Sequence, residues 1–179
     1  MMGRDPCKGF IELVFRIPGN RGAIKHLIDE VIPILSEKGF KIDGDRLRLV
    51  LSEAFTNALL YGSLQLSSDI RESQGDTFFW QLVDRREQDK KYAFNEIKLQ
   101  IACVQNGLRF RIEDKGKGFD WNNRLKEMTS ERDGTSKDGH PLKTHGRGLW
   151  IIKKNVDALG WNKRGNEIIF TIKLSARSP

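Results

Sequence analysis

The stretch that decides the fold of this chain is LSEAFTNALLYG, residues 51–62. Together with the residues just before it, this stretch is strongly apolar and rich in good helix formers. The pattern predicts a helix over about residues 45–61 that stops at Gly62. Glu53 and Asn57 are four residues apart, so both project from the same face of that helix. The apolar stripe of the helix lies next to them. A carboxylate and a carboxamide at the edge of a buried surface can face a cleft.

The chemistry of this pair suits a divalent cation or a proton transfer. Both side chains offer hard oxygen donors, as Mg²⁺ requires, and Mg²⁺ keeps several waters and takes few protein ligands. A Glu at the edge of a buried surface can also act as a base toward a hydroxyl group or water. Taken alone, a Glu and an Asn on a helix are more often plain polar surface, so the pair gains meaning only together with other motifs.

A β-hairpin is predicted downstream of this helix. Residues 97–103 and 108–112 alternate apolar with polar positions, which is the period of half-buried strands. The dipeptide Asn-Gly at residues 106–107 is a strong signal for a tight turn between them. Similar alternation predicts one strand near residues 11–17 and a final strand over residues 168–174.

Two glycine motifs stand where a ligand can approach the backbone. In DKGKG, directly after the return strand, Gly116 and Gly118 allow close approach of a flat or charged ligand, and Asp114 can accept a hydrogen bond from an exocyclic amine. The second motif, GRGL at residues 146–149, begins a predicted helix, and free N–H groups at a helix start bind phosphate. Its surroundings exclude a Walker-type loop and a dinucleotide fingerprint. Taken alone, the first glycine motif is more simply an ordinary Gly-rich turn, and the second is equally compatible with a simple junction between a loop and a helix.

Two further helices are predicted at the ends of the chain. Asn20 is a suitable N-cap for a helix that Pro33 either ends or kinks, and Gly39 closes that region. The helix that begins after the second glycine motif carries an apolar stripe from Leu149 to Leu159, with Gly160 at its end.

The remaining segments are less regular. Residues 63–95 are polar and weakly patterned, apart from one short predicted strand over residues 77–83. Residues 121–145 form a predicted long loop, which inside a compact domain is usually functional or disordered. With no internal repeat and no low-complexity linker, the economical interpretation is a single α+β domain over residues 1–179.

Composition is that of an ordinary globular protein. Of the 179 residues, 38% are hydrophobic and 31% are charged. No apolar run is long enough to cross a bilayer, and the N-terminus lacks the layout of a signal peptide, so we expect a cytoplasmic protein with no membrane partner. Cys7 and Cys103 lack a metal-ligand spacing, and Cys103 alternates with apolar strand positions, which predicts a reduced core thiol.

The formal net charge of +7 raises the question of a nucleic-acid partner. The basic residues are scattered and often stand beside acidic ones, as at residues 84–91, and no aromatic-basic alternation is present. We therefore expect no direct nucleic-acid binding and interpret the charge as favouring an acidic ligand or partner.

The three motifs, in this order and these settings, match one family pattern. Residues 51–62 resemble the N box of the GHKL ATPase superfamily, residues 113–119 its first glycine box and residues 146–149 its second. A stand-alone chain that begins with a strand at residues 10–17 and then Pro-Gly resembles the bacterial anti-sigma-factor serine/threonine kinases. The resemblance implies a histidine-kinase-like ATPase fold, a two-layer sandwich whose mixed, mainly antiparallel sheet carries about three helices on one face. Residues 63–95 would then be an insertion.

The resemblance also implies roles for the residues of the first two motifs. Asn57 would bind the magnesium ion that bridges the ATP phosphates, and Glu53 would be the catalytic base. Asp114 would accept a hydrogen bond from the adenine amino group, and Gly116 and Gly118 would allow the nucleotide to come close.

In the third motif, the resemblance implies that backbone N–H groups of Gly146, Gly148 and Leu149 contact the phosphates. Arg147 would add a positive charge there, although its side chain is equally compatible with solvent. The preceding loop, residues 121–145, would be a lid over the ATP.

Three functions follow as hypotheses. The first is a protein kinase that uses magnesium-ATP to phosphorylate an anti-sigma antagonist and also binds a sigma factor, commonly as a homodimer. The second is a nucleotide-dependent switch that binds partners without catalysis, which Tyr61 and the segment 63–95 favour, because such kinases often carry a His at the position of Tyr61. The third is the nucleic-acid binder. A phosphoacceptor role for His26 is disfavoured, because no two-helix dimerisation segment precedes the domain.

Overall fold

The computed structural model describes residue 7 and residues 12–93, 95–105, 107–123 and 147–174. Within these residues a five-stranded sheet has the order β1-β2-β3-β5-β4. The strands are β1 (Leu13–Pro18), β2 (Glu96–Val104), β3 (Gly107–Glu113), β4 (Ala158–Trp161) and β5 (Glu167–Lys173). The helices are α1 (Arg21–Glu37), α2 (Gly44–Asn57), η1 (Ala58–Ser63), α3 (Ser68–Gln88), α4 (Lys90–Ala93) and α6 (Arg147–Lys154).

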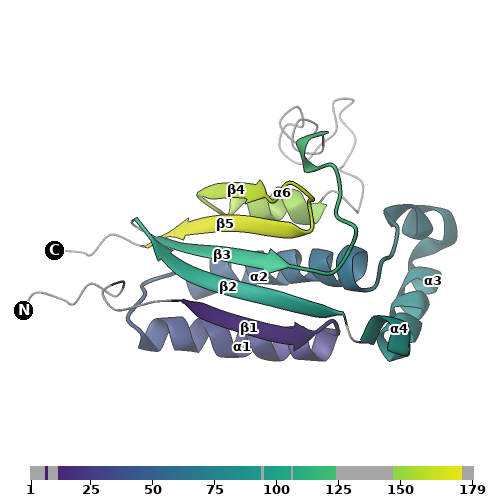
Figure 1. Cartoon of the computed structure of the whole chain (residues 1–179), viewed down its shortest axis with the longest axis horizontal. Helices are drawn as coiled ribbons and strands as arrows, with labels where there is room; N and C mark the ends of the chain where they lie inside the picture. The colour runs from purple at the N-terminus through teal and green to yellow at the C-terminus, as the bar shows by residue number, and fades with distance from the viewer. Residues whose placement is uncertain (1–6, 8–11, 94, 106, 124–146, 175–179) are drawn as a thin grey trace, which may run out of the picture.

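The architecture is the predicted α+β fold. Helices α1, α2 and α6 lie together on one face of the sheet, behind it in Figure 1, and no helix of the described residues covers the opposite face. The core lies between these two layers and takes buried side chains from α1, α2, α6 and the inward positions of β2, β3 and β5. Each of the four strand pairings among the described residues is antiparallel, so the expected mixed character is not seen there.

The predicted hairpin forms, and its register explains the core. Leu99 lies opposite Ile112 and Ile101 opposite Phe110, and all four side chains are buried. Phe110 in turn stacks on Phe170 of β5, with ring centroids 5.0 Å apart. The side chains that alternate in the sequence therefore fill one face of the sheet, as the period-2 pattern requires.

The helix start at Asn20 is confirmed, because its side chain accepts a hydrogen bond from the backbone N–H of Ala23 at 2.8 Å. Pro33 lies inside α1 and does not end it. The second predicted helix is also present, with Asp43 as its N-cap. It ends as an α-helix at Asn57 and continues as the π-helix η1, a wider turn that is frequently found at functional sites.

Two secondary-structure predictions are wrong. Residues 77–83 lie inside helix α3 and form no strand, because Phe79 and Val83 are one helical turn apart and both are fully buried. The last predicted helix is too long. It ends at Lys154, where Asn155 bonds back to the carbonyls of Ile151 and Ile152, and residues 158–161 then form β4.

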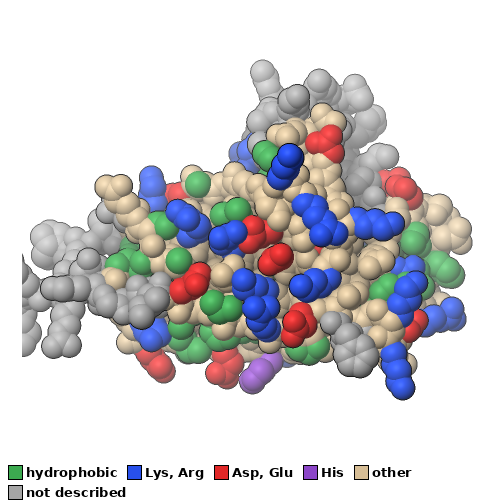
Figure 2. All heavy atoms as spheres, viewed as in Figure 1, with side chains coloured by type: hydrophobic (Ala, Val, Ile, Leu, Met, Phe, Trp, Pro, Cys, Tyr) green, Lys and Arg blue, Asp and Glu red, His purple; other side chains and the backbone are tan. Residues whose placement is uncertain are grey.

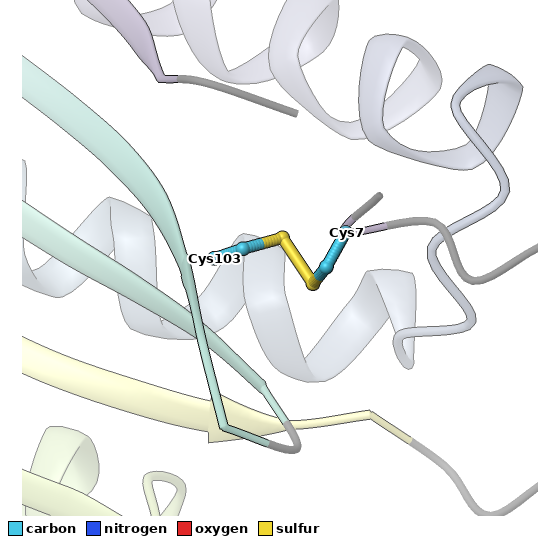
Figure 3. The surroundings of a disulfide bond; sticks show 2 residues. All are labelled: Cys7 and Cys103. Carbon is cyan, nitrogen blue, oxygen red and sulfur yellow. A yellow bond between two sulfur atoms is a disulfide. The ribbon is translucent and has the colours of Figure 1, made fainter. Parts of the chain in front are cut away.

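The expectation of a reduced Cys103 is also wrong. Cys103 forms a disulfide with Cys7, with their Cα atoms 5.7 Å apart (Figure 3). The alternation along β2 correctly places Cys103 in a strand, but it carries no information on a partner 96 residues away. Because disulfides are rare in reducing compartments, the cysteines give no support to a cytoplasmic location.

The open face of the sheet carries charges of both signs. Figure 2 shows Asp and Glu side chains among the Lys and Arg side chains of this face. Lys98 lies opposite Glu113, and Arg111 makes a bidentate ion pair with Glu167 at 2.9 and 3.0 Å. In the described ranges, no helix combines the length and the apolar composition needed to span a bilayer.

Candidate functional site

A pocket of about 590 Å³ lies between the α2–η1 helix and the adjoining ends of β3 and β5. Four of the predicted site residues line it, namely Asn57, Asp114, Gly118 and Leu149. Much of its wall is apolar, with Ala54, Ala58, Ile112 and Ile168 among the lining residues. An apolar pocket with a few convergent polar groups is the usual form of a small-molecule site.

Asp114 lines this pocket, and hydrogen bonds of its backbone hold it in place. Its N–H donates to the carbonyl of Asn166 at 3.0 Å, and its carbonyl accepts from Nδ2 of the same residue at 2.7 Å. Its carboxylate accepts a hydrogen bond from the N–H of Gly116 at 2.7 Å. Burial raises the pKa of Asp114 to about 6, against the opposing effect of that hydrogen bond. At neutral pH the site therefore presents a desolvated carboxylate able to accept further hydrogen bonds.

Gly62 at the end of the helical motif and the two glycines of the first glycine motif, Gly116 and Gly118, allow segments of the chain to pack closely against one another. A Cβ atom on Gly62 would lie 2.2 Å from Cγ of Asp114, and one on Gly116 would lie 2.7 Å from Cα of Gly62. Gly118 has φ +78°, and a Cβ there would lie 2.0 Å from the carbonyl oxygen of Arg164. The end of η1 and the turn after β3 thus require glycine to reach their observed separation, and this separation shapes the pocket.

Glu53 and Asn57 meet the beginning of α6. A Cβ atom on Gly148 would lie 2.7 Å from Oε2 of Glu53 and 3.7 Å from both end atoms of the Asn57 amide. Burial raises the pKa of Glu53 above its ordinary value. Nδ2 of Asn57 is buried and has no hydrogen-bond partner among the residues that the structure describes. Because buried polar atoms are almost always paired, an unpaired one at a pocket wall points to a ligand or ordered water.

Of the third motif, residues 146–149, the structure describes residues 147–149. Arg147 is exposed at the start of α6, whereas Leu149 lines the pocket. Gly146 lies outside the described residues, as does the predicted lid from residue 124 onward. Tyr61 lines the pocket and is half-buried, and burial raises the pKa of its phenol.

An aromatic cluster at the mouth of the pocket was missed by sequence reasoning. Trp161 of β4 packs edge-on against Phe119 at 5.9 Å and stacks near Trp121 at 6.0 Å between ring centroids. Phe119 and Trp161 both line the pocket, and Phe119 is 42% exposed. Phe119 follows the first glycine motif directly and could have been noticed, but nothing in the sequence indicates that Trp161 would lie beside it.

The polar support of Asp114 was also missed. In the turn between β4 and β5, Oδ1 of Asn162 accepts from the N–H groups of Gly165 and Asn166 at 2.7 and 3.2 Å. Asn166 then holds the backbone of Asp114 through the two bonds described above. The pocket therefore depends on the C-terminal hairpin as well as on the three motifs.

Comparison with known protein families matches residues 28–172 to the histidine kinase-like ATPase domain. This match covers most of the chain, and the chain belongs to that family. Among curated proteins, none matches the sequence closely enough to count as a relative. The family assignment confirms the resemblance to the GHKL superfamily, and with it an ATP-binding type of domain on the observed α+β fold.

Proposed function

We propose that this chain is a magnesium-ATP-dependent protein kinase that phosphorylates a Ser or Thr of an anti-sigma antagonist and also binds a sigma factor. The observation that carries the proposal is the approach of Glu53 and Asn57 to Gly148 at the start of α6, next to a pocket that Asn57, Leu149 and Asp114 line. A carboxylate, a carboxamide and a helix N-terminus together provide a base, a metal ligand and phosphate-binding N–H groups.

The residues present fit magnesium-ATP. The pocket volume of about 590 Å³ lies within the range of small-molecule sites. Asp114 offers an acceptor for an exocyclic amine, and Nδ2 of Asn57, which has no partner among the described residues, is a donor that a ligand would satisfy. Asn57 would hold the metal through its amide oxygen, because Mg²⁺ takes oxygen donors.

Each residue has a distinct task in this proposal. Bound ATP supplies the phosphoryl group, and transfer of that group depends mainly on positioning and charge neutralisation. Glu53 would take the proton from the Ser or Thr hydroxyl of the protein substrate, and its raised pKa makes it a stronger base than an ordinary Glu. The N–H groups of Gly148 and Leu149 at the start of α6 would face the phosphates.

The test is transfer of radiolabel from ATP to candidate antagonist proteins. We expect label on a Ser or Thr of one antagonist with the wild-type chain, and none with Glu53→Ala. Tight ATP binding without transfer to any antagonist would contradict the kinase proposal while leaving the nucleotide site intact.

A second candidate is a non-catalytic switch whose partner binding depends on the nucleotide. It is favoured by helix α3, which exposes the large apolar side chains of Phe78 (47%) and Trp80 (38%). In that case Glu53→Ala leaves partner binding unchanged, whereas Asp114→Asn abolishes nucleotide binding and alters the affinity for the partner.

Direct nucleic-acid binding is not proposed, and a salt-dependent affinity for DNA or RNA would overturn that view.

A further inference from the structure

The segment between η1 and α3, residues 64–67, forms part of the pocket wall. Leu66 and Ser67 line the pocket, and Leu64 and Leu66 are buried. Between these two leucines, Gln65 has φ 52°, in the left-handed region that non-glycine residues rarely adopt. Such a conformation persists only where neighbouring contacts hold the backbone in place.

The contacts that hold this segment come from two sides. On one side, the N–H groups of Leu64 and Leu66 donate to carbonyls within η1, those of Leu59 and Leu60, each at 2.8 Å. On the other side, Nη1 of Arg86 donates to the carbonyl oxygens of Leu64 at 2.5 Å and of Gln65 at 2.9 Å. The guanidinium of Arg86, on α3, thus donates to the carbonyls of the two peptide groups on either side of Gln65, the residue with positive φ.

Arg86 is itself held in place. Its guanidinium carbon lies 5.0 Å from the ring centroid of Tyr92, which is buried. The next residue of α3, Glu87, accepts hydrogen bonds from the backbone N–H and Nε of Arg21 at 2.8 and 2.9 Å. Asp84 also pairs with Arg21. The end of α3 is therefore bonded to the start of α1 as well as to the pocket wall, and Figure 1 shows α4, which follows α3, close to the start of α1.

We infer that Arg86 is a positioning residue for the nucleotide site. Through the carbonyls of Leu64 and Gln65, it fixes the wall formed by residues 64–67 and thereby sets the affinity of the pocket for ATP. The inference rests on the proposed nucleotide binding. Because Glu53 and Asn57 lie on α2, the loss of Arg86 weakens ATP binding but leaves phosphoryl transfer at saturating ATP nearly unchanged.

The test compares Arg86→Met with Arg85→Met by calorimetric titration of each full-length variant with magnesium-ATP. Arg85 is the exposed neighbour on the same helix and makes none of the contacts above, so the two variants lose the same charge. The methionine at position 86 keeps an apolar stem against Tyr92 but has no donors. We expect R86M to weaken ATP binding about 10-fold and R85M by less than about 2-fold, because only R86M leaves two charge-assisted bonds unmade.

Two additional readouts separate positioning from general stability. R86K, which keeps the charge but not the fork, is expected to bind ATP with an affinity between those of wild type and R86M. If transfer to an antagonist is observed, R86M is expected to raise KM for ATP with kcat nearly unchanged, whereas a general loss of structure would lower kcat as well.

The outcomes are distinct. If the wild-type chain does not bind ATP, the proposed function fails and this inference fails with it. If the wild type binds ATP and R86M binds it as tightly as R85M, only the inference is overturned. If R86M does not fold, R86K decides: a loss of affinity relative to R85M supports the role of Arg86, and an affinity equal to that of wild type contradicts it.

Discussion

Asp114 shows at the scale of one residue how binding and stability oppose each other. Among the described residues its carboxylate accepts a single hydrogen bond, from Gly116, and burial raises its pKa to about 6 from 3.8. A carboxylate buried in this way destabilises the ligand-free fold at neutral pH, because the unfolded chain solvates the charge better. Residues of this kind are retained for function in spite of their cost to stability.

Asp114→Asn is therefore expected to stabilise the ligand-free protein while abolishing ATP binding. The folded-state pKa lies above the unfolded value, so the destabilisation by the charge is full above pH 6 and disappears as the pH falls toward 4. A shift of this size corresponds to at most about 3 kcal/mol. Urea unfolding of both proteins between pH 4 and pH 8 should show a stability gap that widens with increasing pH. A gap independent of pH would contradict the assigned environment of Asp114.

Glu53 carries the catalytic part of the proposal. Glu53→Gln keeps the shape of the side chain but removes the base, so phosphoryl transfer is expected to fall by about 100- to 10,000-fold. Because the base must be deprotonated and burial raises its pKa, wild-type activity should decline on acidification at a higher pH than for an ordinary Glu. Initial rates across pH, together with the ATP affinity of each protein, check both statements. Equal loss of affinity and rate would assign Glu53 to binding.

At the scale of elements, the site depends on the approach of α6 to α2. Gly148→Ala would place a Cβ 2.7 Å from Oε2 of Glu53, and this carboxylate must then move. Since small displacements at a reacting group are costly, transfer is expected to fall by about 10- to 100-fold with the fold retained. Gly160→Ala in β4 is the matched control, because a Cβ there meets no atom of the described residues within 4 Å. Equal activity of the two variants would show that the α2–α6 contact is unimportant.

The success of sequence reasoning differed between elements for physical reasons. Helix α2 and the β2–β3 hairpin were predictable because each buries one face, which imposes a period of 3.6 or 2 on the sequence. The prediction for residues 77–83 was wrong because a short, largely apolar segment fits a strand and a buried helix equally well. Only the packed structure shows that Phe79 and Val83 are buried on the same side of α3.

The candidate site was predictable to the extent that its residues lie in local motifs. Glu53 and Asn57 share one helix turn, and Asp114 directly follows a strand, so short patterns contain them. Trp161 and Asn166 reach the pocket from the C-terminal hairpin, and their positions depend on strand pairing between distant segments. No spacing rule in the sequence connects them to Asp114.

At the scale of the molecule, the disulfide between Cys7 and Cys103 ties the N-terminal segment to β2 across 96 residues. Cross-links that close loops of about 100 residues can stabilise by up to about 4.7 kcal/mol in the chain-entropy description, and removal of native disulfides typically costs about 2–5 kcal/mol. The double substitution Cys7→Ser and Cys103→Ser is therefore expected to lower the free energy of unfolding by about 2–5 kcal/mol. Urea unfolding with and without reductant measures it.

This change should leave the nucleotide site intact. Cys103 lies near the end of β2 at the hairpin turn, whereas Asp114 follows the opposite end of β3. ATP affinity in the double Cys-to-Ser variant is thus expected to match that of the oxidised wild type. Unchanged stability would mean that the bond does not constrain the chain, and a large loss of affinity would mean that the two ends of the sheet are coupled.

The most direct test of the central claim is thermal unfolding of the wild-type chain during titration with ATP, in the presence and absence of magnesium. A ligand that binds only the folded state adds about 2.7 kcal/mol at a concentration 100 times its Kd, which raises Tm by roughly 5–10 °C in a domain of this size. We expect such a rise with magnesium-ATP, a smaller one without the metal, and none for Asp114→Asn. The absence of any shift in the wild type at millimolar ATP with magnesium would contradict the nucleotide site itself.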